Sequence, residues 1–179
     1  MSEFKFQFLK GAEISDKNFG LFYNLLEKAF PRVEYRSFEG QKALLHKDIY
    51  EILFCFDDEK IIGAMSFWHL DRFVFIEHFV VDETARGHGI GTKMLDKIKS
   101  YINGFVILEV ELPYNEMSKK RICFYERNGF VYNDFEYFQQ PLNKGDEPLP
   151  LRIMSYPKEL SAKEFEATRK QLIKAVYNS

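Results

Sequence analysis

The sequence predicts an α+β fold, built around a mixed and mostly antiparallel twisted sheet of about seven strands with helices packed against it. Three features support this fold class. Short stretches that alternate polar and apolar residues recur along the chain, as they do in half-buried strands. Between them lie segments with apolar residues at helical spacing. Near the middle, a strand-like segment passes through a glycine-rich turn, residues 86–91, into a helix-like one.

The first elements are a strand and two helices. Residues 4–9 alternate and predict a strand. Ser15 and Asp16 are suited to begin a helix with a phenylalanine- and leucine-rich face. Pro31 ends that helix, because proline cannot continue the helical hydrogen bonds. A second, short helix is expected after Ser37.

Three antiparallel strands follow. Alternation and β-branched or aromatic content predict strands over residues 49–56, 61–70 and 73–81. The acidic turn at residues 57–60 makes a hairpin of the first two, and residues 71–72 make the next turn.

The second half alternates helices and strands. The glycine-rich turn leads into a helix, and the apolar strand after it predicts a crossover with parallel strands. Gly129 is expected as a left-handed helix stop, and Ser161 with Glu164 as a capping box. These elements are a helix over 90–102, a strand over 105–110, a helix over 118–128, strands over 130–138 and 151–156, and a terminal helix over about 161–177. We expect a single domain over 1–179, with a core over about 4–156.

The composition of the chain argues against some classes of binding partner. The net charge is −2 and no apolar run is long enough for a membrane span, so we expect neither a nucleic-acid nor a membrane partner. The first residues lack the apolar core of a signal peptide, and the two cysteines fit a reducing compartment, so a cytoplasmic location is expected. Aromatic residues make up 17% of the chain, which is compatible with a homodimer surface as well as an aromatic core.

The glycine-rich turn predicts an anion site. The first amides of a helix have no helical partner, and the helix dipole adds positive potential, so a phosphate fits there. A Walker A loop is excluded, because the sequence reads Gly91-Thr92-Lys93 where that loop needs Gly-Lys-Ser/Thr. A dinucleotide fingerprint is excluded because it needs a glycine at Thr92.

Two motifs resemble the GNAT superfamily of acetyl-CoA-dependent N-acetyltransferases. Residues 86–91, Arg-Gly-His-Gly-Ile-Gly, are similar to the family's pyrophosphate loop. Tyr125 to Phe130 is similar to the Tyr-x-x-x-Gly-Phe end of the family's fourth helix, and the order of elements over residues 4–156 also matches. The resemblance implies acetyl-CoA as co-substrate and an amine as acceptor. It implies that the cofactor-binding residues are Phe79, Val81, Arg86, Gly87, His88, Gly89, Ile90, Gly91 and Thr92.

The resemblance also suggests catalytic residues. Glu77 is the candidate base, because the family often has a glutamate on this strand. Its apolar neighbours predict a raised pKa, although a salt-bridged structural glutamate is the alternative. His78 would compete only if a bulge turned it to the same face. Tyr125 resembles the family's general acid for the thiolate. Tyr35, Phe38 and Glu39 lie in the segment that lines the family's substrate side, and they are possible substrate contacts.

The predicted function is direct transfer of an acetyl group from acetyl-CoA to a primary amine. The first alternative is an acyl-CoA-binding or regulatory module without turnover, and the second is a nucleotide-binding Rossmann domain. A covalent route through Cys55 or Cys123 is disfavoured, because both are expected to be small core residues. No metal site is expected, since the four histidines show no ligand spacing. The motifs do not identify the acceptor.

Overall fold

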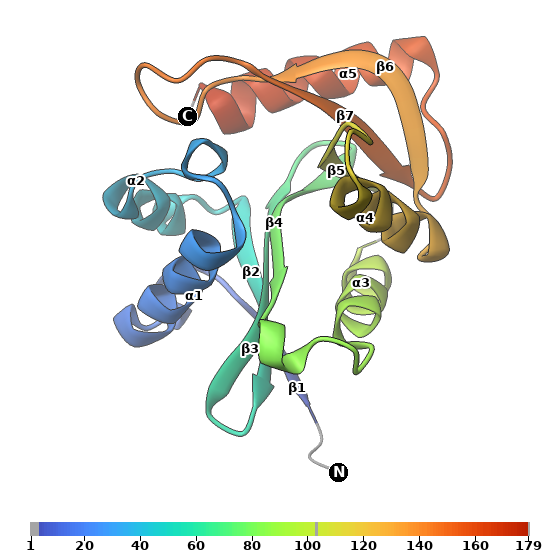
Figure 1. Ribbon diagram of the computed structural model, residues 1–179. Helices are drawn as coiled ribbons and strands as arrows, with labels where there is room; N and C mark the ends of the chain where they lie inside the picture. The colour runs from blue at the N-terminus through green and yellow to red at the C-terminus, as the bar shows by residue number, and fades with distance from the viewer. Residues whose placement is uncertain (1–3, 103, 179) are drawn as a thin grey trace. The chain divides into compact units, whose positions relative to one another are not determined.

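The computed structural model describes residues 4–102 and 104–178 (Figure 1). Residues 1–3, on which the expectation about a signal peptide partly rests, lie outside the described part. The chain forms two compact units. The first consists of Met1–His69 and Ile76–Asn103, and the second of Leu70–Phe75 and Gly104–Ser179.

The first unit contains a hydrogen-bonded run of strands with helices on both faces. Its helices α1 and α2 lie on one side of β2 and β3, and α3 lies on the other (Figure 1). Its elements are β1 (Lys5–Leu9), α1 (Asp16–Ala29), α2 (Phe38–Ala43), β2 (Tyr50–Asp57), β3 (Lys60–His69), most of β4 (Phe73–Val81) and α3 (Ile90–Tyr101).

Local signals in the sequence set these boundaries. The hydroxyl of Ser15 accepts from the amide of Asn18 and so begins α1, as predicted. Ser37 does the same for α2. The hairpin between β2 and β3 turns where Asp57 pairs with Lys60, and Asp58 takes the left-handed backbone conformation that this turn needs (φ +52°).

The core of the first unit lies on both faces of β2 and β3. Seven of the eight residues of β2 are buried. On one face, the ring of Phe22 in α1 meets Phe54 edge-on, with ring centroids 6.3 Å apart. On the other face, a Cβ at Gly63 would lie 2.9 Å from the sulfur of Met94, so the bare glycine lets α3 approach β3 closely.

The second unit is a three-stranded sheet with two helices. Its elements are β5 (Phe105–Glu111), α4 (Glu116–Arg127), β6 (Val131–Gln139), β7 (Leu149–Tyr156), α5 (Ala162–Leu172) and a π-helical turn (Ile173–Tyr177). Strand β7 lies between β5 and β6 and is antiparallel to both. Helix α5 runs alongside β6 and β7, where Phe165 stacks on Phe135 with centroids 4.5 Å apart (Figure 1).

Three local predictions concern the ends of helices in the second unit. Helix α4 begins two residues before the predicted start, because the Asn115 side chain accepts from the Ser118 amide and caps the helix. The predicted stop is confirmed, since Gly129 takes the left-handed conformation (φ +85°). The predicted capping box of Ser161 and Glu164 at the start of α5 is also confirmed.

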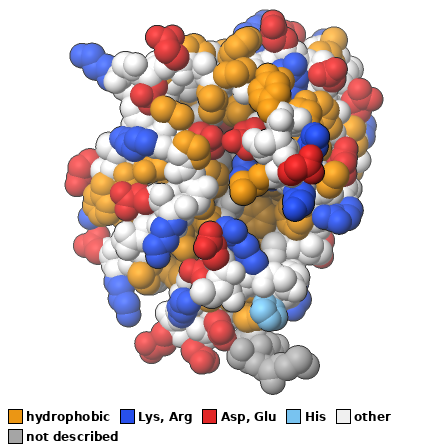
Figure 2. Space-filling model, viewed as in Figure 1, with side chains coloured by type: hydrophobic (Ala, Val, Ile, Leu, Met, Phe, Trp, Pro, Cys, Tyr) orange, Lys and Arg blue, Asp and Glu red, His pale blue; other side chains and the backbone are white. Residues whose placement is uncertain are grey.

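The seven strands have the order β1-β2-β3-β4-β5-β7-β6. The predicted α+β class, with about seven strands and flanking helices, is confirmed. Within the described residues, no helix is both long enough and apolar enough to cross a bilayer. On the face shown in Figure 2, Lys and Arg side chains are interspersed with Asp and Glu, so that face carries no extended basic surface.

Candidate active site

The glycine-rich turn connects β4 to α3 within the first unit. After Val81, the Asp82 side chain accepts from the Thr84 amide and starts a short 3-10 turn. Two glycines then take conformations that other residues rarely adopt, with φ +85° at Gly87 and +71° at Gly89. Gly89 is the cap residue of α3, so the predicted turn from strand into helix is confirmed.

The start of α3 offers free amide groups. The amide of Lys93 is hydrogen-bonded to the Gly89 carbonyl at 3.0 Å. The amides of Ile90, Gly91 and Thr92 come before that bond and have no acceptor within the helix. A Cβ built at Gly89 would meet no other atom within 4 Å, so the space beside the turn is open. A diphosphate fits such a surface of amides with positive potential.

The side chains of the turn brace its backbone. Arg86 Nε donates to the Val81 carbonyl at 3.2 Å, and its guanidinium lies 3.7 Å from the exposed Glu83 carboxylate. Nδ1 of His88 lies 3.1 Å from the Arg86 carbonyl and 3.3 Å from that of Ala85. The His88 side chain therefore contacts the backbone of the turn itself.

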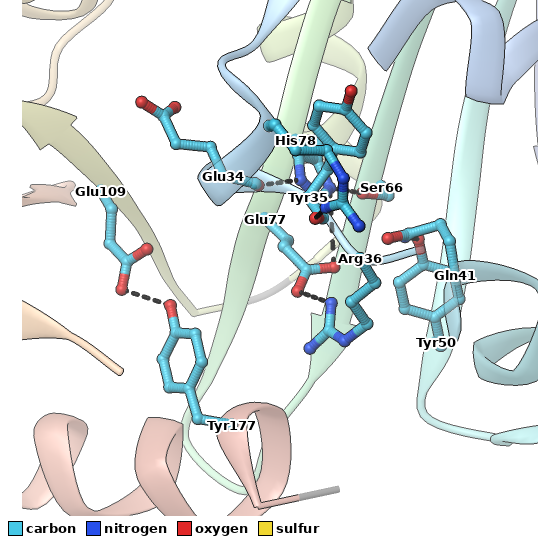
Figure 3. A network of polar contacts seen from close by, with 11 residues as sticks. Glu34, Tyr35, Arg36, Gln41, Tyr50, Ser66, Glu77, His78, Glu109 and Tyr177 are labelled. Carbon is cyan, nitrogen blue, oxygen red and sulfur yellow. Dashed lines mark hydrogen bonds and ion pairs between the residues drawn. The ribbon is translucent and has the colours of Figure 1, made fainter. Parts of the chain in front are cut away.

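Glu77 on β4 forms a buried ion pair (Figure 3). Its Oε1 lies 2.5 Å from Nη1 of Arg36, and the two side chains are 4% and 9% exposed. Arg36 comes from the segment just before α2. The hydroxyl of Tyr23 donates to the Arg36 carbonyl at 3.1 Å and helps to fix that segment.

The prediction of a raised pKa for Glu77 is wrong. Burial does raise the pKa, but the Arg36 guanidinium and other neighbours outweigh burial and hold the pKa below its ordinary value. The salt-bridged alternative describes the observed environment. No property of residues 73–81 points to Arg36, because the two partners are 41 residues apart in the sequence.

The imidazole of His78 is buried and uncharged. Burial lowers its pKa, so the imidazole is uncharged near neutral pH. Its Nε2 donates to the carbonyl of Glu34 at 2.8 Å, which leaves Nδ1 to accept from the Ser66 hydroxyl at 3.3 Å. The ring also meets Phe30 edge-on. The imidazole therefore fastens the segment before α2 to β4.

Three further buried residues line the region of Glu77. Gln41 Nε2 donates to the Tyr50 hydroxyl at 2.8 Å, and the Tyr50 and Trp68 rings meet edge-on with centroids 5.2 Å apart. Burial raises the pKa of Tyr50, so it remains a neutral phenol. No pattern in the sequence points to these residues, which come from α2, β2 and β3.

Tyr125 lies in α4 of the second unit and is 8% exposed. Burial raises its pKa to about 12, so the phenol keeps its proton throughout the physiological range. Its ring packs edge-on against Phe124 and Phe130, with centroids 5.3 and 5.7 Å away.

Comparison with known proteins decides the family. The sequence model described as "Acetyltransferase (GNAT) domain" matches residues 48–132. The curated protein "Putative acetyltransferase YjbC" of Bacillus subtilis (strain 168) is 30% identical over 161 residues, which are 87% of this chain and 80% of that protein. This chain belongs to the GNAT family of acetyltransferases. It is therefore an acyltransferase.

Solved structures agree with this assignment. The structure titled "Putative acetyltransferase from GNAT family from Bacteroides thetaiotaomicron" has a TM-score of 0.87 and 31% identity, and the match covers 98% of this chain and 99% of that one. Naa50 of Arabidopsis thaliana, in complex with the bisubstrate analogue CoA-Ac-MVNAL, has a TM-score of 0.58 at 21% identity, covering 84% of this chain and 97% of that one. The second likeness concerns the fold alone. The predicted GNAT fold is thus confirmed.

The predicted site residues of this GNAT protein fall in both units. Glu77, Phe79, Val81 and the turn from Arg86 to Thr92 belong to the first unit. Tyr125 belongs to the second. Of the three residues expected on the substrate side, Tyr35 is buried, Phe38 is 40% exposed and Glu39 is exposed.

The two cysteines of this GNAT protein lie in different environments. Cys55 is buried in β2, as expected, and burial raises the pKa of its thiol to about 11. The expectation for Cys123 is wrong, because it is exposed on the outer side of α4. Among residues 4–102 and 104–178, no group of three His, Cys, Asp or Glu side chains is arranged to hold a metal ion.

Proposed function

We propose that this protein transfers the acetyl group of acetyl-CoA directly to a primary amine. The observation that carries the proposal is the turn at the start of α3. Its two left-handed glycines, free amides and open space form a surface suited to the diphosphate of CoA. The family assignment supplies the reaction class, and the turn supplies the reason to choose CoA as the donor.

The residues proposed to hold acetyl-CoA follow from this surface. The amides from His88 to Thr92 would bind the diphosphate, and the main chain of Phe79 and Val81 would accompany the pantetheine arm. Arg86 adds positive charge while it braces the turn through the Val81 carbonyl. Bound acetyl-CoA would supply an activated acetyl thioester for attack by an amine.

Two side chains are proposed to move protons. A protonated amine has no lone pair for attack, and free alkylamines have a pKa near ~10.4, so a base is needed. Glu77 is the proposed base, and its ionised state near neutral pH is favoured by Arg36. Tyr125, with its pKa raised to about 12, holds a proton that it can share with the departing thiolate.

Calorimetry with CoA and two Gly89 variants tests the donor site. Asp and Asn both tolerate the left-handed conformation of Gly89 and are similar in size, so the two variants differ mainly in charge. We expect Gly89→Asp to weaken CoA binding at least about tenfold more than Gly89→Asn, because a carboxylate repels the diphosphate. Equal binding by the two variants would show that the phosphates bind elsewhere.

An acyl-CoA-binding module without turnover is the second candidate function. The observation that favours it is the buried pairing of Glu77 with Arg36, since a paired carboxylate with a low pKa is a weaker base. Release of free CoA with a panel of primary amines separates the two. Turnover with any amine supports the enzyme, and CoA binding without release supports the module.

We also propose that the protein self-associates. Tyr114 and Met117 in the second unit are 78% and 71% exposed, which is unusual for large apolar side chains. Sedimentation of the wild type and of a Tyr114→Ser/Met117→Ser variant tests this. A dimer in the wild type that becomes a monomer in the variant supports the proposal, and a monomer in both rejects it.

A further inference from the structure

The ion pair between Arg36 and Glu77 is removed from water. Its charged atoms are 2.5 Å apart, and both side chains are at least nine-tenths buried. A buried ion pair is weak evidence for stability, because the loss of hydration offsets most of the attraction. Because stability alone does not account for this pair, and because one partner is the proposed base, we assign the arginine a functional role.

The two oxygens of the Glu77 carboxylate differ. Oε1 is engaged by Arg36, whereas Oε2 is buried and has no hydrogen-bond partner among the described residues. Nδ1 of His78 lies 3.6 Å from Oε2, but in the neutral ring this nitrogen carries a lone pair and faces Ser66. Oε2 therefore keeps its full capacity to accept a proton.

The other groups around Glu77, His78 included, lower its pKa less than Arg36 does. Of the described residues, the titratable and charged groups that face the carboxylate are Arg36 from the segment before α2, Tyr50 from β2 and His78 from β4. Tyr50 and His78 are neutral. On β3, the Trp68 indole also favours the ionised carboxylate, although its N–H makes no well-formed hydrogen bond. The charge of Arg36 is thus the main influence that opposes burial.

We propose that Arg36 is a positioning residue for acetyl transfer: it holds Glu77 ionised through Oε1 and leaves Oε2 as the atom that receives the proton of the acceptor amine. This inference rests on the function proposed above. In that step an N–H bond of the ammonium breaks, its electron pair remains on nitrogen, and an O–H bond forms at Oε2. The proton is later returned to solvent, and Arg36 itself does not titrate.

The direct test is the titration of Glu77 by NMR, which needs no substrate. Protein labelled with 13C in the glutamate carboxyl groups is compared for the wild type, Arg36→Gln and Arg36→Lys, with Glu77→Gln to assign the resonance. Removing the charge of Arg36 should raise the pKa of Glu77 by about one unit or more, because the effect of burial is then no longer opposed by a nearby positive charge. Lysine keeps the charge and should restore most of the shift.

The kinetic test is the pH profile of CoA release with the best amine of the panel. In Arg36→Gln the pH below which kcat/KM declines should be higher than in the wild type. Below that pH, kcat/KM should fall about tenfold per pH unit, and it should recover in alkaline buffer. The KM for acetyl-CoA should stay within about twofold. Arg152→Gln, which breaks an ion pair with the exposed Asp134, serves as the control and should leave the profile unchanged.

The outcomes separate this inference from the proposed function. An unshifted Glu77 titration in Arg36→Gln overturns the inference, as does a loss of rate that is equal at every pH. If Arg36→Gln does not fold, the wild type decides alone, and a Glu77 pKa at or above the ordinary glutamate value of about 4.3 overturns the inference. If the wild type acetylates no amine but the titration still shifts, the proposed function fails while the pairing of Arg36 with Glu77 stands.

Discussion

The Tyr177 hydroxyl donates a hydrogen bond to Oε1 of Glu109 at 2.6 Å. This contact joins the π-helical turn that follows α5 to strand β5 within the second unit, although the residues are 68 positions apart. The same oxygen accepts from Tyr137 on β6. The carboxylate of Glu109 thus connects three elements that are distant in the sequence.

We expect Tyr177→Phe to destabilise the protein by about 1 kcal/mol, because a hydrogen bond to a charged acceptor is lost at a half-buried site. Denaturant unfolding followed by circular dichroism measures the change. Tyr114→Phe is the matched control, since Tyr114 is 78% exposed, and it should be neutral. Equal midpoints for the wild type and Tyr177→Phe would show that the contact adds no stability.

His78 should make the protein sensitive to mild acid. Burial lowers its pKa in the folded state, so below about 6.5 the unfolded chain binds a proton that the folded chain does not. Stability should therefore fall as the pH decreases from about 6.5 toward the lowered pKa of the folded state. Glu77, whose pKa is also lowered, adds a further loss below about 4.3.

The variant that isolates this effect is His78→Gln. Its amide can still donate to the Glu34 carbonyl but does not titrate, so the slope of unfolding free energy between about pH 6.5 and 5 should flatten. Urea unfolding at intervals of half a pH unit gives the slope. A slope that is identical in the wild type and the variant would assign the acid sensitivity to other groups.

Tyr125→Phe should lower kcat roughly a hundredfold or more, which is the usual contribution of a general acid. CoA affinity measured by calorimetry should be unchanged, because only the hydroxyl is removed. Tyr132→Phe makes the same chemical change on β6 and should keep full activity. Full activity in Tyr125→Phe would remove this residue from the proton transfer.

Two glycine substitutions should act in opposite directions. Gly63→Ala places a Cβ 2.9 Å from the Met94 sulfur and should cost about 1–3 kcal/mol, because this contact between α3 and β3 becomes overpacked. Gly20→Ala meets no atom within 4 Å inside α1 and should stabilise by about 0.5–1 kcal/mol, because alanine favours the helix. Thermal unfolding of both variants checks the signs. A lower melting temperature for Gly20→Ala than for Gly63→Ala would contradict both explanations.

The sequence predicted the features that depend on short-range patterns. The hairpin turn at Asp58, the cap at Ser15 and the left-handed stop at Gly129 are encoded within a few residues, and all three are observed. The glycine turn before α3 belongs to the same class, because its φ values are a local requirement.

The features that were missed depend on contacts between distant parts of the chain. The sign of the pKa shift at Glu77 was wrong, because it depends on Arg36, whose approach is set by the packing of the segment before α2. The exposure of Cys123 depends on which side of α4 faces its neighbours. Helical spacing alone separates two faces without saying which of them is covered.

The order β5-β7-β6 has a consequence for biosynthesis. Strand β5 pairs with β7, which comes after β6 in the sequence and ends at Tyr156, so the ribosome must make α4, β6 and β7 before β5 gains this neighbour. Until β7 is available, the edges of β5 and β6 that pair with it are exposed to water and can associate with other nascent chains. The emergence of β7 from the ribosome therefore determines when β5 and β6 gain their common partner strand.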